Sequence, residues 1–515
     1  SGTSISFGTP VVFENATVSF ISPTFDTSNN KVVIAYRDTG NSNYGTLIVG
    51  TVSGTSISFG TAIVFQTANS YYISATFDSS NNKVVTAYRN DGNSGHGTAV
   101  VFSVQPGDFA TNLTSENFVG ITNGVVDYDS GPASVGSEVV FESAAASHIT
   151  SAFDSNSNKV VIAYTDDPNS YYGTAVVGTV SNMSISFGTP VVFESASTGY
   201  KSATFDSNSN KVVIAYSDGP SGSDTSRAVV GTVSGTGISF GTPVVFESSE
   251  IKYTSVVFDS SNNKIVIAYS DSGNTEYGTA IVGTVSGTNI SFGTAVVFES
   301  GNEGAIFTAA AFDTNSNKVV IAYRHKANSE YGTAIVGTVS GTGISFGTKV
   351  VFNSAESNYM AATFDSTSNK VVIAYTDNGN SNYGTAIVGT VSGTNISFGT
   401  AAVFRASTSI YISSSFDSDS NKVVIAYTDD SGKASAGTVS GTSISFASPV
   451  VFDSNNVIHT ASVFDSNSKK TVIAYRDLVN SQYGTGIVFA PAFDNTVRGS
   501  TASGSTAIIQ AGGAV

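Results

Sequence analysis

The stretch Phe205-Asp206-Ser207-Asn208-Ser209-Asn210-Lys211-Val212-Val213-Ile214-Ala215-Tyr216 decides the fold, because the chain of 515 residues repeats it with small changes. Its phenylalanine recurs nine times, at Phe25, Phe77, Phe153, Phe205, Phe258, Phe312, Phe364, Phe416 and Phe464. Successive copies are 52, 76, 52, 53, 54, 52, 52 and 48 residues apart. A period of about 50 residues indicates a repeat architecture, in which each copy buries apolar surface against its neighbours.

One repeat, residues 200–247, predicts four short strands. β-branched residues dominate its apolar runs, and Gly, Ser, Asn and Asp fill the segments between them, which favours strands joined by tight turns. The strands are expected at Tyr200 to Phe205, Lys211 to Tyr216, Ala228 to Val233 and Ile238 to Glu247. Four strands in about 50 residues match one blade of a β-propeller.

The distribution of side-chain sizes favours a radial arrangement. The first strand contains the small residues Ser202, Ala203 and Thr204, which suit a crowded centre, and bulkier Val, Ile and Phe fill the later strands. A β-helix usually has shorter coils, and separate sandwiches need more strands per domain. We therefore predict an all-β propeller.

Two incomplete repeats predict a closed ring. Seven of the nine copies, Phe153 through Phe464, follow the single long gap. Gly136 to Glu142 looks like a fourth strand without the preceding three, whereas the last repeat, Phe464 to Phe489, lacks a fourth strand. Joining them completes a blade and removes the exposed sheet edges. Residues 136–490 are therefore predicted to form a seven-bladed β-propeller of four-stranded blades with split-blade closure.

Residues 1–104 hold two further blades, from a fourth strand at Ile5 to Glu14 to a third strand at Thr98 to Val104. Two blades cannot close a ring, so they are either the tail of an upstream, incomplete propeller or an element that a partner completes; we favour the first. Residues 105–135 and 491–515 leave the repeat. They are expected to be connectors, the second continuing in a longer parent chain.

Composition excludes several classes of function. The formal charge of −16 argues against binding to nucleic acid or to anionic membranes, which needs clustered Lys and Arg. No apolar run reaches the roughly 18 residues of a membrane span. Cysteine is absent and the four His are scattered, so neither a disulfide framework nor a zinc motif is expected. The chain is expected to be soluble.

The loops on one face are the candidate binding region. Turns such as Ser234 to Gly237 barely change between repeats, whereas the loops at the other face vary in length and composition, as recognition loops do. An aromatic residue or His stands five residues before each Phe-Asp, so seven of them should crowd around the channel mouth. They are expected to stack on sugar rings or hydrogen-bond a polar ligand, or instead to plug the channel or pack between blades. These residues are His148, Tyr200, Tyr253, Phe307, Tyr359, Tyr411 and His459.

Charged positions supply weaker candidates. Arg324, His325 and Lys326 form a basic spot on the variable face and are a candidate contact for an anionic ligand. The turns beginning at Asp154 and Asp206 faintly resemble a calcium loop, but each offers one carboxylate, so hairpin turns are favoured over calcium and no cofactor is expected. No isolated pair of carboxylates with basic clamps is found, so a propeller glycosidase is the less favoured reading.

A resemblance adds to this interpretation. The string Asn112-Leu113-Thr114-Ser115-Glu116-Asn117-Phe118-Val119-Gly120-Ile121, together with the repeat, resembles β-propeller-repeat fibre or adhesin-like proteins of marine viruses and phages. The resemblance covers nearly the whole chain and implies an extracellular or virion-surface protein in host attachment. We therefore expect a non-enzymatic tail-fibre-like adhesin that binds a host glycan or surface protein, with carbohydrate binding through the variable face. The alternative is a purely structural bead of a fibre.

Overall fold

The computed structural model describes residues 9–27, 31–53, 56–78, 83–102, 133–218, 225–301 and 304–492, with the backbone of 496–500 and 506–510. Within these ranges the chain forms antiparallel β-sheets, and the helical segments are single 3₁₀ turns such as η1 (Asp91–Asn93). The all-β prediction is confirmed. Residues 105–132 of the predicted connector 105–135, residues 1–8 and residues 511–515 lie outside the described residues. No helix in the described part is long and apolar enough to cross a membrane.

The chain divides into two compact parts, residues 1–130 with 494–515, and residues 131–493. The described strands of the first part form one sheet in the order β1-β2-β3-β5-β6-β7, with β4 paired to β3. Their bounds are β1 (Val18–Asp26), β2 (Lys31–Asp38), β3 (Tyr44–Ser53), β4 (Ser56–Phe59), β5 (Ile63–Asp78), β6 (Lys83–Asn90) and β7 (His96–Phe102). Two short strands, β40 (Thr496–Ser500) and β41 (Thr506–Gln510), pair with each other.

The second part, residues 131–493, contains the seven copies from Phe153 to Phe464, here numbered repeats 1 to 7. The strands of repeats 1 to 3 are β8 (Ser134–Val135), β9 (Val139–Asp154), β10 (Lys159–Asp166), β11 (Tyr172–Ser181), β12 (Ser184–Phe187), β13 (Val191–Asp206), β14 (Lys211–Asp218), β15 (Thr225–Ser234), β16 (Gly237–Phe240), β17 (Val244–Glu247), β18 (Ile251–Asp259), β19 (Lys264–Asp271), β20 (Tyr277–Ser286), β21 (Asn289–Phe292) and β22 (Val296–Glu299).

Repeats 4 to 7 continue the same pattern. Their strands are β23 (Ala305–Asp313), β24 (Lys318–His325), β25 (Tyr331–Ser340), β26 (Gly343–Phe346), β27 (Val350–Asp365), β28 (Lys370–Asp377), β29 (Tyr383–Ser392), β30 (Asn395–Phe398), β31 (Ala402–Thr408), β32 (Ile410–Asp417), β33 (Lys422–Thr428), β34 (Gly432–Ser440), β35 (Ser443–Phe446), β36 (Val450–Asp453), β37 (Val457–Asp465), β38 (Lys470–Asp477) and β39 (Tyr483–Ala490).

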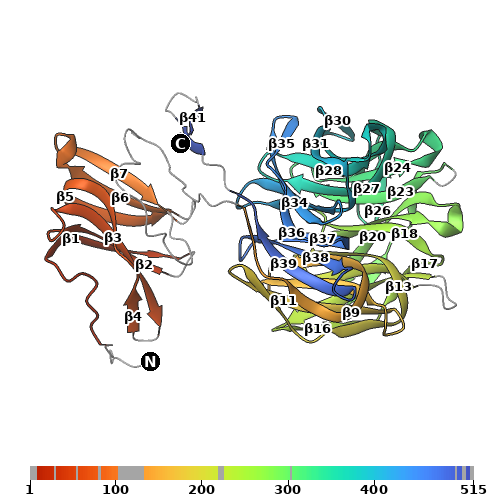
Figure 1. The fold of residues 1–515 in the computed structure, drawn as a ribbon, viewed down its shortest axis with the longest axis horizontal. Coiled ribbons are helices and arrows are strands. Elements are labelled where there is room, and N and C mark those ends of the chain that lie inside the picture. The colour runs from red at the N-terminus through yellow and green to blue at the C-terminus, as the bar shows by residue number, and fades with distance from the viewer. Residues whose placement is uncertain are drawn as a thin grey trace. The chain divides into compact units, whose positions relative to one another are not determined.

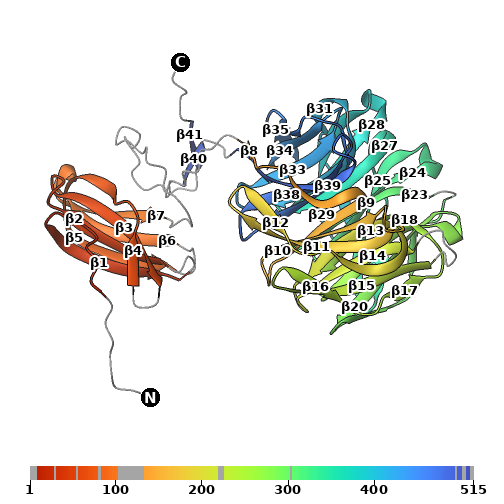
Figure 2. The same ribbon diagram turned by 60° about the horizontal axis from the view of Figure 1, so that its bottom comes forward.

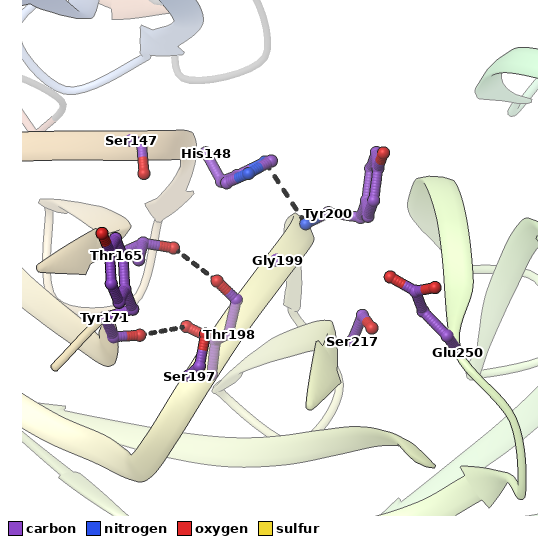
Figure 3. Close-up of a pocket in the computed structure, with 10 residues that line it drawn as sticks. All are labelled: Ser147, His148, Thr165, Tyr171, Ser197, Thr198, Gly199, Tyr200, Ser217 and Glu250. Atoms are coloured by element: carbon purple, nitrogen blue, oxygen red, sulfur yellow. Dashed lines mark hydrogen bonds between the residues drawn. The ribbon is translucent and has the colours of Figure 1, made fainter. Parts of the chain in front are cut away.

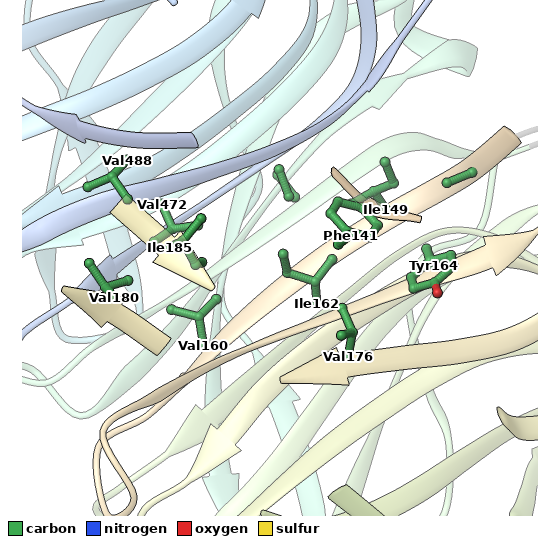
Figure 4. Packing of buried hydrophobic residues seen from close by; sticks show 13 residues of the cluster. Phe141, Ile149, Val160, Ile162, Tyr164, Val176, Val180, Ile185, Val472 and Val488 are labelled. Atoms are coloured by element: carbon green, nitrogen blue, oxygen red, sulfur yellow. The ribbon is translucent and has the colours of Figure 1, made fainter. Parts of the chain in front are cut away.

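The apolar second strand of each repeat is buried on both faces. In β10, Val160 and Ile162 pack in a cluster with Val472 and Val488 of repeat 7 (Figure 4). The alternate residues of β10 pack instead against repeat 2. Because successive side chains of a strand point to opposite faces, a strand between two neighbours needs apolar residues at every position. This explains the uninterrupted Lys-Val-Val-Ile-Ala-Tyr run.

The first and last strands of this part lie side by side. In β39, Thr485 pairs with Val140 and Gly486 with Val139, so the pairing expected for the stretch near Val139 is present (Figures 1 and 2). The short strand β8 also pairs with β39, which extends the paired segment two residues before the predicted boundary at 136. The first strands of the repeats contact one another in a complete cycle. Each strand contacts the next in the order β9, β13, β18, β23, β27, β32 and β37, and β37 contacts β9.

The predicted continuous fourth strand, Ile238 to Glu247, is wrong in one respect. It is two segments, β16 and β17, which pair with different halves of β15. Between them the Gly241 amide donates to the Val230 carbonyl at 2.9 Å. A Cβ on Gly241 would lie 2.0 Å from the Thr288 carbonyl oxygen of the next repeat, so the break brings neighbouring repeats into close contact.

The strand predicted at Ile5 to Glu14 is also wrong where the structure describes it, since residues 9–14 form no strand. Phe13 nevertheless packs against Tyr36, with ring centroids 5.3 Å apart, and Glu14 accepts a hydrogen bond from the Tyr36 hydroxyl at 3.1 Å. The side-chain contacts of the repeat therefore persist without its backbone ladder.

Buried tyrosines link neighbouring repeats. The hydroxyl of Tyr164 donates to Glu142 at 2.9 Å, and that of Tyr216 donates to Glu194 at the same distance. Glu142 and Glu194 lie in the parts of β9 and β13 that pair with the third strand of the preceding repeat, so each bond spans a junction. Each of these tyrosines therefore stabilises the junction in two ways, through its buried ring and through the hydrogen bond of its hydroxyl.

We predict that Tyr164→Phe lowers the free energy of unfolding of the larger part by about 1–2 kcal/mol, because Glu142 loses its donor. Urea denaturation followed by circular dichroism measures this. Tyr171→Phe, which removes a hydroxyl from an exposed ring, is the control and should change it by less than about 0.5 kcal/mol. Equal effects of the two substitutions would contradict the assignment.

Candidate functional site

Seven side chains, one from each repeat, form a closed chain of ring contacts, here called the aromatic annulus. Neighbouring ring centroids lie 4.9 to 5.6 Å apart, and the circle closes between His459 and His148 at 5.4 Å. Its members are the seven residues that the sequence singled out, His148, Tyr200, Tyr253, Phe307, Tyr359, Tyr411 and His459. All seven are half-buried. The structure thus brings them together, and contact with a ligand stays a prediction.

An unusual backbone aims these rings. Each of the seven residues has a positive φ, from 40° at Tyr200 to 55° at His459, and each lies in a register shift between the first and second strands. A left-handed conformation costs a residue with a Cβ roughly 1–2 kcal/mol. Ring packing contributes about 0.5–1.5 kcal/mol per aromatic pair. The two effects are of similar size, so the annulus supports its own strained backbone.

The two histidines stand where the ring of contacts closes. Burial, with Lys201 nearby, lowers the pKa of His148 to about 3. Burial, with Arg476 nearby, lowers the pKa of His459 to about 4. Both imidazoles are therefore neutral at pH 7, and the Tyr200 amide donates to His148 Nδ1 at 3.4 Å. Neutral rings here act as aromatic surface and hydrogen-bond acceptors.

Beneath these histidines lies a buried cluster of charges. Lys201 is 8% exposed and donates to the Thr198 carbonyl at 3.2 Å and to the Thr165 hydroxyl. Burial lowers the pKa of the Lys201 ammonium below its usual range. Asp167 acts in the opposite direction on Lys201 and accepts from Arg476 at 3.1 Å. The Asp167–Arg476 pair joins repeat 1 to repeat 7.

A small cleft opens beside the annulus, between repeats 1 and 2 (Figure 3). Its volume is about 240 Å³, below the roughly 300 Å³ of typical small-molecule sites, so it suits one ring of a longer ligand. Hydroxyl-bearing side chains dominate its wall. The lining residues are Ser147, His148, Thr165, Tyr171, Ser197, Thr198, Gly199, Tyr200, Ser217 and Glu250.

The cleft wall combines polar groups held by hydrogen bonds with an exposed aromatic ring. The Thr165 hydroxyl donates to the Thr198 carbonyl at 2.7 Å, and the Thr198 hydroxyl donates to the Tyr171 carbonyl at 3.4 Å, which holds the wall in place (Figure 3). The buried Ser217 hydroxyl has no hydrogen-bond partner among the described residues. Tyr171 leaves 55% of its surface exposed. Such a wall offers an aromatic face and hydroxyl groups to a polar ligand.

The three residues of the predicted basic spot, Arg324, His325 and Lys326, have different surroundings in the structure. Arg324 lies against the annulus, with its guanidinium 5.2 Å from the Phe307 ring centroid, and it forms an ion pair with Glu356 at 2.8 Å. His325 bonds Glu299 at 3.2 Å, and burial lowers its pKa. Lys326 begins the 3₁₀ turn η4 (Lys326–Asn328). An anionic ligand would therefore compete with carboxylates for Arg324 and His325.

The Asp-x-Asn turns use their own carboxylates. Asp206 Oδ1 accepts from the backbone amides of Asn208 at 2.9 Å and Ser209 at 3.0 Å, and Oδ2 accepts from the Ser209 hydroxyl at 2.6 Å. Asp154 makes the same three bonds in its turn. These carboxylates cap hairpin turns, which is the interpretation favoured from sequence.

Sequence reasoning missed Tyr171 and Lys201, although both leave a signal. Tyr171 occupies a loop position where repeats 3, 4, 5 and 7 have Glu276, Glu330, Asn382 and Gln482. Lys201 follows the annulus residue, where the six other repeats of the larger part have Ile, Thr or Met. The prediction used positions that are aromatic in most repeats. Tyr171 and Lys201 each differ from the residues at the same position in the other repeats, so they were not selected.

Comparison with solved structures identifies a similar fold. The BP39L lectin from Burkholderia pseudomallei matches with a TM-score of 0.51 at 8% sequence identity, covering 68% of this chain and 97% of the lectin. At this identity the likeness shows the fold alone, and it fits a propeller-like all-β arrangement. A structure described as NanB plus Optactamide matches with a TM-score of 0.41 at 11% identity, covering 92% of this chain and 91% of that chain. That score carries no argument.

No protein-family description matches the chain. No curated protein matches it either.

We predict that the thermal midpoint of the larger part falls as the pH is lowered from about 6.5 towards 4. A His with a depressed pKa in the folded state stabilises the fold fully above its unfolded pKa of about 6.5, and this contribution is lost as the pH falls towards the folded pKa. The double variant His148→Tyr with His459→Tyr, which uses the residue of four other repeats, should show a smaller fall. Calorimetry at a series of pH values measures it.

The control is His96→Tyr, at an exposed position in the smaller part. It should leave the pH dependence of the larger part unchanged. If the double variant lost stability with falling pH as steeply as the native chain, the buried neutral histidines would not be its source.

Proposed function

We propose that the larger part is a seven-bladed β-propeller that binds a glycan at the cleft beside Tyr200 and Tyr171, without cleaving it. The observation that carries the proposal is the wall of this cleft, which combines the exposed Tyr171 ring with a polar lining that includes Glu250. The lectin's fold does not carry it, because the similarity extends to the fold alone.

Three observations support the propeller. The first strands contact one another in a complete cycle, and β39 pairs with β9. Seven apolar clusters each join two successive repeats, including repeat 7 with repeat 1. A radial arrangement with split-blade closure explains all three and leaves no open sheet edge between repeats. Residues 1–104 are proposed to be the tail of an upstream propeller.

The chemistry of the cleft favours a sugar. A pyranose presents an apolar C–H face and a rim of hydroxyl groups, and it is recognised by an aromatic ring together with convergent donors and acceptors. Tyr171 supplies the exposed ring, and Glu250 supplies an acceptor for ligand hydroxyls. The small volume allows one sugar ring to enter while the rest of the glycan lies along the loop face.

The same wall argues for binding over hydrolysis. Most glycosidases use a pair of carboxylates flanking the scissile bond. Glu250 is the single carboxylate among the ten residues that line the cleft. Asp167 lies nearby, but its oxygens accept from the Ser147 hydroxyl at 2.6 Å and from Arg476 at 3.1 Å. Because both Asp167 oxygens are already hydrogen-bonded, Asp167 is assigned a structural role next to the cleft and not the role of a second catalytic carboxylate.

We propose an extracellular or virion-surface setting, and the similarity of the repeat to fibre or adhesin-like proteins of marine viruses and phages supports it. A fibre or adhesin-like protein on a virion or cell surface would use such a cleft to contact host-surface glycans. The negative net charge fits a partner other than nucleic acid.

We predict that the chain gives saturable hits on a glycan array, and that Tyr171→Ala weakens binding of the best hit by about tenfold, as expected for the loss of one stacking contact. Isothermal titration with that glycan gives the affinity. Asn382→Ala, at the same loop position in repeat 5, is the matched control and should bind as the native chain does.

Two results would overturn the proposal. The first is an array without hits, or binding that Tyr171→Ala leaves intact. The second is release of sugar from the bound glycan, measured by mass spectrometry, above the rate without protein. The second result would favour a glycosidase.

A further inference from the structure

We infer that Glu138, Asp453 and Asp477 form a calcium site at the point where the first and last repeats of the larger part join. One ligand oxygen from each of the three carboxylates lies within 4.8 Å of the others. Asp453 and Asp477 are buried, at 3% and 2% exposure, and Glu138 is exposed. This inference does not depend on glycan binding.

The three carboxylates come from both ends of the larger part. Glu138 directly precedes β9, Asp453 ends β36, and Asp477 ends β38. Because β9 lies near the start of the larger part and β38 is its penultimate strand, a cation held by all three would join its two ends. The backbone pairing of β9 with β39 lies beside the same junction.

An equivalent junction in the same chain carries its own positive charge. By alignment of the repeats, Glu299, His325 and Lys349 stand where Asp453, Asp477 and Glu138 stand. There Lys349 bonds Glu299 at 2.7 Å and His325 bonds it at 3.2 Å. The chain thus places a cationic side chain where the final junction has a third carboxylate.

Two other junctions are neutralised in a different way. Arg227 lies 3.1 Å from Asp218 and 3.5 Å from Glu194. Asp429 is paired with both Arg405 and Lys433. No ion pair of Glu138, Asp453 or Asp477 with Lys, Arg or His is found among the described residues.

A buried hydroxyl provides a second, independent observation. Tyr475 is 0% exposed, and its hydroxyl faces Asp453 without a hydrogen bond of good geometry. The equivalent Tyr164, Tyr216 and Tyr323 donate to a glutamate at 2.9 to 3.0 Å. Asp453 is one methylene shorter than those glutamates, and the Tyr475 hydroxyl adjoins both Asp453 and Glu138. Asp453 Oδ2 is likewise buried without a hydrogen bond.

The oxygen ligands of the three carboxylates favour calcium over other metal ions. Burial and the neighbouring carboxylates raise the pKa of both Glu138 and Asp453, as expected for negative charges held together. Carboxylate and hydroxyl oxygens suit a hard cation, whereas zinc prefers nitrogen and sulfur ligands. Calcium accepts six to eight oxygens in flexible geometry, and water can complete the shell on the exposed side of Glu138.

The test is titration of the calcium-free chain with calcium chloride. We expect calorimetry to detect one calcium ion per chain at this site, and calcium to raise the thermal midpoint of the larger part by at least about 2 °C. Terbium in place of calcium should luminesce on excitation of tyrosine, because Tyr475 adjoins the site.

Glu138→Lys is the most informative variant, because it copies Lys349. It should raise the midpoint in EDTA, which shows that the variant folds, and should abolish the calcium-dependent shift. Asp477→Asn should abolish that shift too. Asp166→Asn, at the position of Asp477 in repeat 1, is the matched control and should respond to calcium as the native chain does.

The inference is overturned if calcium neither binds nor raises the midpoint of the native chain. It is equally overturned if the calcium-dependent shift survives in Glu138→Lys or in Asp477→Asn.

Discussion

The backbone pairing between β39 and β9 is the constraint on which the arrangement of the larger part depends. Each repeat buries its second strand between two neighbours, so an open row of repeats would expose one apolar face at each end. The pairing of Thr485 with Val140 brings the ends together. Val472 and Val488 of repeat 7 then pack with Val160 of repeat 1, and every second strand acquires two neighbours.

Several departures from the repeat pattern meet at the closing junction. His148 and His459 meet there in the annulus, and the Asp167–Arg476 pair crosses it. The proposed glycan cleft opens on one side of repeat 1, and the three carboxylates of the proposed calcium site lie on repeat 7's side. Seven similar repeats supply the frame, and changes confined to a few repeats supply the chemistry of the proposed sites.

The sequence predicted those features that each repeat encodes for itself. Strand positions, the all-β class and the pairing of two incomplete repeats follow from a period near 50 residues and from turn residues such as Asn210. The break in the fourth strand at Gly241 was missed, because it serves contact with Thr288 of the next repeat and leaves the apolar pattern unchanged.

The site was predictable in part. The annulus positions follow from one column of the repeat, and the structure brings all seven together. Tyr171 lines the cleft and Lys201 bonds its wall, and each of these residues occurs in one repeat only. The carboxylate cluster brings Glu138 together with Asp453 and Asp477, which follow it by more than 300 residues in the sequence. Such groupings need the closed arrangement before they become visible. Whether the annulus contacts a ligand stays a prediction.

Oxidation of an introduced cysteine pair tests the closure most directly, because the chain has no cysteine of its own. Val140→Cys with Thr485→Cys places two thiols at directly paired positions, whose Cα separation of roughly 4.5–5.5 Å permits a disulfide. The account predicts a monomer in which mass spectrometry finds residues 140 and 485 linked. Val140→Cys with Thr333→Cys, at the equivalent position in repeat 4, should not form this link. Free thiols or links only between chains in the first variant would contradict the closed arrangement.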